Sequence, residues 1–90
     1  MKKVNQNHQE KFEDSVAGLE VKITKTVQNG NVSFYASVQR GEKETASVSY
    51  DRKGSYLIVR LSEPDSFTEE ERKALLDAAG NWTKELTSEG

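Results

Sequence analysis

LEVKITKTVQNGNVSFYASVQ, residues 19–39, decides the fold because two alternating stretches flank one strong turn signal. Before the turn, apolar residues recur at every second position, at Leu19, Val21, Ile23 and Val27. Only Lys25 breaks this row, and a period of two is typical of a strand with one buried face. Asn29-Gly30 favours a type I′ hairpin turn, because that turn needs positive φ at both central positions.

The stretch after the turn predicts the partner strand. Its apolar residues are Val32, Phe34, Ala36 and Val38. A two-residue loop at Asn29-Gly30 would place Val27 opposite Val32, Ile23 opposite Ala36 and Val21 opposite Val38. All three pairs are apolar, so turn chemistry and alternation predict the same register.

Two further strands are expected, over residues 45–50 and 55–61, joined by the turn DRKG at residues 51–54. Asp at the first turn position and Gly at the fourth suit a type I turn that ends in a residue with positive φ. The fourth strand is largely apolar on both faces, so a one-residue bulge could exchange them. The favoured arrangement buries three aliphatic residues and leaves the arginine in water, with Leu57, Val59 and Leu61 inward and Tyr56, Ile58 and Arg60 outward.

The period changes after Pro64. Thr68 followed by Glu71 forms the pattern of a capping box, which predicts a helix that starts near Glu69. An apolar stripe for the inward sheet face is made by Leu75, Ala79, Trp82 and Leu86, joined by Leu76. We expect the helix to continue through Trp82, and the alternative is that Gly80 ends it early.

These elements predict an α+β domain. Four antiparallel strands in meander order carry one C-terminal helix on one face (ββββα), within a single domain over residues 15–88. Residues 1–14 show no clear period and hold Val4 as their one aliphatic residue, so we expect a flexible N-terminal arm there. Ninety residues support only a modest core.

Composition argues against several function classes. The chain has no cysteine, which excludes thiolate chemistry, and its one histidine, His8, stands in a polar context. The acidic residues near the start of the helix lack the spacing of a calcium loop, and the six glycines form no phosphate-binding loop. We therefore expect a protein that is not an enzyme, with no catalytic residues, no metal and no cofactor.

The start of the chain and its hydropathy indicate the compartment. No apolar segment follows the first lysines, and no stretch has membrane-spanning length, so we expect a cytoplasmic protein that does not contact a membrane. The net charge of −2 conceals a mildly basic middle, since residues 15–61 carry seven positive and four negative side chains. That surplus permits a weakly basic surface, and it is smaller than duplex binding requires.

The outward sheet face is the candidate binding site. It is expected to display Lys22, Tyr35, Tyr56, Ile58 and Arg60, with Arg52 and Lys53 on the adjoining turn. Tyrosines can stack on unpaired bases while lysine and arginine neutralise phosphates, so single-stranded nucleic acid is the first expected ligand.

Two other interpretations of this face stay open. The same face, or an edge strand, could dock a protein partner, as an adaptor or inhibitor does. An ordinary solvated sheet also looks like this. The apolar positions Tyr56 and Ile58 further predict a homodimer that covers the fourth strand.

Overall fold

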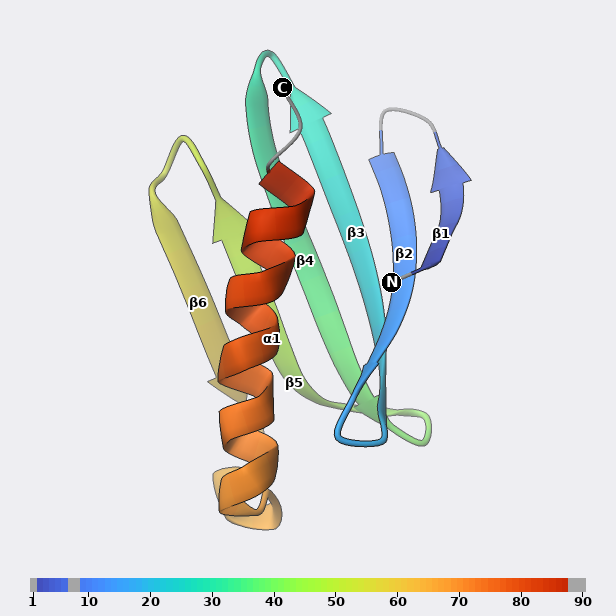
Figure 1. The fold of residues 1–90 in the computed structure, drawn as a ribbon, viewed down its shortest axis with the longest axis vertical. Helices are drawn as coiled ribbons and strands as arrows, with labels where there is room; N and C mark the ends of the chain where they lie inside the picture. Colours follow the sequence, from blue (N-terminus) through green and yellow to red (C-terminus); the bar gives the residue numbers. More distant parts are fainter. Residues whose placement is uncertain (1, 7–8, 88–90) are drawn as a thin grey trace.

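The computed structural model of the protein describes residues 2–6 and 9–87, with side chains from Gln9 onward. Within these ranges the chain forms one antiparallel sheet in the order β1-β2-β3-β4-β5-β6, followed by a short 3₁₀ turn and one helix, α1. Figure 1 shows α1 lying across one face of the sheet, which leaves the opposite, outer face open. The elements are β1 (Lys2–Gln6), β2 (Gln9–Val16), β3 (Leu19–Gln28), β4 (Asn31–Arg40), β5 (Lys43–Asp51), β6 (Tyr56–Leu61), η1 (Pro64–Ser66) and α1 (Glu69–Thr87).

The central hairpin, β3 and β4, has the predicted register. Val27 lies opposite Val32, Ile23 opposite Ala36 and Val21 opposite Val38. Asn29 and Gly30 have φ of 52° and 79°, as a type I′ turn requires. The helix side of this hairpin is the centre of the core, and the inward residues of both strands are largely buried.

The fourth predicted strand, β6, also has the favoured orientation. Val59 and Leu61 pack against the core on the helix side, opposite Val48 and Ala46 of β5. Ile58 and Arg60 lie on the outer face, opposite Ser49 and Ser47. Leu57 shares the inward row but is 43% exposed, so the expectation that it is a core residue is wrong.

The turn between β5 and β6 differs from the expected one. The hydrogen bond that closes it runs from the N–H of Ser55 to the carbonyl of Arg52, at 3.1 Å, one residue later than predicted. Ser55, with φ of 56°, takes the left-handed conformation that was expected at Gly54. Gly54 lies in a crowded place instead, because a Cβ there would lie 2.9 Å from a carboxylate oxygen of Asp51 and 3.0 Å from the ring of Tyr56, and these side chains would have to shift.

Helix α1 begins as predicted. The N–H of Glu71 donates to the hydroxyl of Thr68 at 3.1 Å, and the N–H of Thr68 donates to the Glu71 carboxylate at 2.8 Å. This is the reciprocal capping box. The helix continues past Gly80 to Thr87, and its buried stripe is Leu75, Ala79, Trp82 and Leu86. Leu76 does not join this stripe and is 61% exposed.

The N-terminal segment corrects the prediction of a flexible arm. Residues 2–6 and 9–14 lie in β1 and β2, and β2 pairs with β3 along its whole length. The segment is ordered because two of its residues contact the core and the helix, although most of its side chains are polar. Phe12 packs against the core, and the indole N–H of Trp82 donates to the Asp14 carboxylate at 2.8 Å. A turn with positive φ at Ala17 and Gly18 joins β2 to β3.

The fold class is therefore confirmed as α+β, an antiparallel meander with a C-terminal helix. The sheet contains the four predicted strands together with β1 and β2. Residues 1, 7, 8 and 88, to which the predicted arm and domain extended, lie outside the described residues.

Candidate functional site

The open face of the sheet presents rows of side chains that run across the strands. One row crosses β2 to β6 as Lys11, Thr24, Tyr35, Ser49 and Ile58, and the next as Glu13, Lys22, Ser37, Ser47 and Arg60. Small hydroxyl side chains occupy β5 in both rows. Tyr35 on β4 and Ile58 and Arg60 on β6 are larger and stand beside this low floor.

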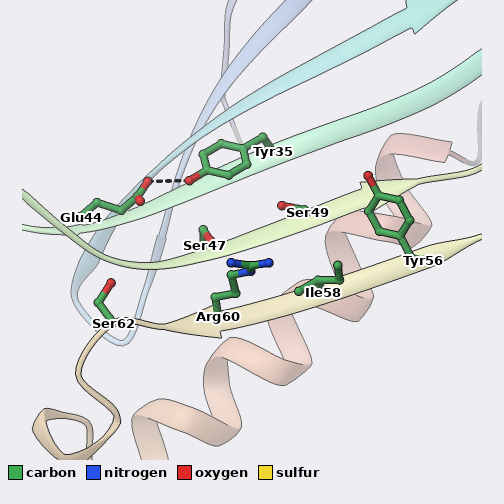
Figure 2. Close-up of a pocket in the computed structure, with 8 residues that line it drawn as sticks. All are labelled: Tyr35, Glu44, Ser47, Ser49, Tyr56, Ile58, Arg60 and Ser62. Carbon is green, nitrogen blue, oxygen red and sulfur yellow. Dashed lines mark hydrogen bonds between the residues drawn. The ribbon is translucent and has the colours of Figure 1, made fainter. Parts of the chain in front are cut away.

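This floor forms a shallow depression, which we call the β5–β6 hollow. It is lined by Tyr35, Glu44, Ser47, Ser49, Tyr56, Ile58, Arg60 and Ser62. Figure 2 shows Tyr35 on β4 facing Tyr56, Ile58 and Arg60 on β6, with Ser47 and Ser49 of β5 between them. Tyr35 and Tyr56 are each 45% exposed and Ile58 is 39% exposed. Apolar area and hydrogen-bonding groups are thus accessible together.

Tyr35 is held in place on the β4 side of the hollow. Its hydroxyl donates to the Glu44 carboxylate at 2.9 Å (Figure 2). The hydroxyl of Ser37 donates to the same carboxylate oxygen. Burial raises the pKa of Tyr35, and the hydrogen bond to Glu44 raises it further, while Ser47 and Arg60 act in the opposite direction. Tyr35 therefore presents a neutral, oriented phenol at physiological pH.

Glu44 is a functional candidate that the sequence analysis missed. The register of β4 and β5 shifts by one residue, so that Val38 lies opposite Ala46 but Gln39 lies opposite Glu44. Thr45 is the extra residue of this bulge, and it is buried. The bulge turns Glu44 to the outer face, whereas regular alternation would have placed it inward. Nothing in the sequence around Glu44 signals the bulge.

The structure brings together four of the seven predicted site residues. Tyr35, Tyr56, Ile58 and Arg60 all line the hollow. Lys22 lies on the same face but on β3, three strands from Arg60, or about 14 Å at ordinary strand spacing.

Arg52 and Lys53 lie elsewhere, at the end of the sheet near the β3–β4 turn. The Arg52 guanidinium donates to the carbonyl of Thr87 at 3.0 Å, at the end of α1. The N–H of Lys53 donates to the side chain of Asn31 at 2.8 Å, and Asn31 donates to Asp51 at 2.7 Å. This turn thus connects the two hairpins and the helix, and Arg52 has a structural contact.

The outer face has no surplus of positive charge. On β2–β6 the outward strand positions hold three basic side chains, Lys11, Lys22 and Arg60, and four acidic ones, Glu13, Glu20, Glu44 and Asp51. The basic middle of the sequence therefore does not become a basic surface. Part of its positive charge faces the helix instead, where Lys25 is buried and Arg40 lies over the ring of Phe67 and 3.6 Å from Glu71.

Two other kinds of site are absent from the described part of the chain. Residues 2–6 and 9–87 hold no group of three or more side chains arranged to bind a metal ion. No helix in these ranges has the length and apolarity needed to cross a membrane. His8 lies outside the described residues.

Comparison with known proteins finds no protein-family model, no curated protein and no solved structure that matches the chain. Its surface chemistry is therefore the basis for a functional proposal.

Proposed function

We propose that this protein is a non-enzymatic binding module that docks a protein partner in the β5–β6 hollow. The observation that supports this most is the clustering of half-exposed Tyr35, Tyr56 and Ile58 around Arg60 and a floor of serines. Aromatic residues and arginine dominate the binding energy of protein interfaces, especially where they surround a pocket.

The charge of the outer face supports a protein ligand over a polyanion. Arg60 supplies positive charge in the hollow, and Glu44, which lines the same hollow, supplies negative charge. A protein surface can complement both signs, whereas phosphates gain little from a face with no surplus of positive charge.

Photo-crosslinking tests this proposal in cells. A photoreactive amino acid is placed at Ser62, on the lining of the hollow, and for comparison at Lys73, an exposed position on α1. We expect a discrete adduct from Ser62 that contains a protein other than a second copy of this chain, is nuclease-resistant and is lost when Ile58→Asp is added. Equal adducts from both positions, or no adduct from Ser62, would contradict docking in the hollow.

Single-stranded nucleic acid is the second candidate ligand, favoured by one observation. Two half-exposed tyrosines beside an arginine are the side chains on which unpaired bases stack. Titration of a labelled single-stranded oligonucleotide at several salt concentrations tests it. Binding that weakens with salt and is lost in Tyr56→Ala supports this candidate, and absence of binding at low salt excludes it.

Two further expectations from the sequence stay predictions. These are a cytoplasmic location and a homodimer. The exposed Tyr56 and Ile58 make the outer face a candidate dimer surface. The free edge of β6 offers a more specific geometry.

A further inference from the structure

The last strand, β6, ends the sheet, and no described strand pairs with its outer edge. The N–H of Ser62 donates to the carbonyl of Thr45 on β5 at 2.9 Å. Backbone polar groups alternate in direction along a strand, so Leu57, Val59 and Leu61 direct their N–H and C=O groups away from β5. These three residues form an edge that can accept another strand.

This edge lacks the devices that usually prevent strand pairing. Its six residues, YLIVRL, contain no proline, and the single charge, Arg60, lies on the outer face. Natural edge strands are commonly protected by inward charges, prolines or bulges. On its helix side β6 has only aliphatic residues.

Two exposed leucines lie on this side of the sheet. Leu57 is 43% exposed and Leu76 is 61% exposed. Leu76 is turned about 100° around α1 from the buried Leu75. Thr87 lies eleven residues after Leu76, about three full turns, and so on almost the same side of the helix. The carbonyl of Thr87 accepts a hydrogen bond from Arg52, which lies in the turn before β6. The flank of α1 that carries Leu76 therefore faces the β6 edge.

We propose that β6 pairs antiparallel with β6 of a second copy of this chain, about a two-fold axis at Val59. In this register Val59 lies opposite Val59 of the second copy, and Leu57 opposite its Leu61. Each of the three resulting pairs exchanges two backbone hydrogen bonds, because all three residues direct these groups outward. On the helix side every pair is aliphatic, so the exposed Leu57 is covered.

A second copy is the proposed occupant because the β6 edge is complementary to itself. A register centred on Ile58 would place Ser55 opposite Leu61, and Ser55 has φ of 56°, which takes it out of the strand. The Val59 register instead uses only residues within β6. It joins the two sheets into one, brings the two helix flanks that carry Leu76 to the same side, and leaves both β5–β6 hollows open. The dimer therefore does not depend on any ligand in the hollow.

Single-cysteine crosslinking tests the register, since the native chain has no cysteine. Directly opposed residues of a hydrogen-bonded pair have Cα atoms about 5.5 Å apart, which suits a disulfide. The two Leu57 residues would be four positions apart along the strands, or about 13 Å. We expect Val59→Cys to form a covalent dimer on mild oxidation and Leu57→Cys not to. Equal crosslinking of both variants, or of neither, would overturn the register.

Sedimentation equilibrium tests the interface itself. Leu57→Lys should raise the dimer dissociation constant at least about thirtyfold, because each copy loses a buried leucine and gains a charge. Val27→Lys is the matched control, since Val27 is 45% exposed on β3, away from this edge, and it should leave the dimer unchanged. Circular dichroism confirms that both variants are folded. A monomeric wild type, or a Leu57→Lys variant that dimerises normally, refutes the proposal.

Discussion

The hydrogen bond between Trp82 and Asp14 should be worth a large share of the stability of the domain. It joins α1 to β2 across 68 positions of sequence, at 2.8 Å, and the Trp82 ring is 2% exposed. Replacing Asp14 with alanine leaves a buried indole N–H without its acceptor, which costs about 1–3 kcal/mol. In a domain of this size each kcal/mol lowers the melting temperature by about 4–8 °C, so a loss of about 8–16 °C is the central expectation.

A double-mutant cycle separates this bond from other effects of the substitution. Trp82→Phe removes the donor and keeps most of the ring, so Asp14→Ala should cost much less in the Trp82→Phe background than in the wild type. The free energy of unfolding is measured with urea for all four proteins. An equal cost of Asp14→Ala in both backgrounds would refute the hydrogen bond between Asp14 of β2 and Trp82 of α1.

Three further predictions concern the helix and the hollow. Gly80→Ala should stabilise the protein by about 0.5–1 kcal/mol in thermal unfolding, because Gly80 lies in the helix interior and a Cβ there meets nothing within 4 Å; destabilisation would mean that the helix is interrupted there. The hydrogen bond from the Thr68 N–H, helped by Arg40, lowers the pKa of Glu71, so its stabilising effect is present above pH 4.5 and is lost as the pH falls through the lowered value. The stability difference between wild type and Glu71→Gln should accordingly shrink in acid, and a constant difference would contradict the capping box. Burial and Glu44 raise the pKa of Tyr35, so its stabilising effect is present below pH 10.0 and lost as the pH rises through the raised value. The difference in tyrosinate absorbance between wild type and Tyr35→Phe should therefore titrate above pH 10.0, and titration at or below that pH would contradict the contact.

The central hairpin and the helix were predictable because independent local signals agreed. Asn29-Gly30 determines the turn, and the alternation on both sides determines the same register. Thr68 and Glu71 mark the start of α1, and its apolar stripe continues through Gly80. Such signals lie within a few residues of the features they predict.

The remaining features depend on contacts between distant residues. From the sequence alone, Asp14 is expected to be solvated. It lies under the helix because its carboxylate accepts a hydrogen bond from the indole of Trp82. The bulge at Thr45, which turns Glu44 outward, has no marker in the sequence. Alternation alone predicted which residues of the hollow point outward, namely Tyr35, Tyr56, Ile58 and Arg60. The numbers of acidic and basic side chains around them also depend on how β2 aligns with β3, which the sequence did not predict.

The most direct test of the account is the affinity of the partner captured at Ser62 for defined variants. Calorimetry should show that Arg60→Glu weakens binding by at least about thirtyfold, as expected for a central arginine of an interface. Lys73→Glu, on the exposed face of α1, should leave the affinity unchanged. If Arg60→Glu binds the partner as tightly as wild type, or if both variants lose affinity equally, the β5–β6 hollow is not the docking site.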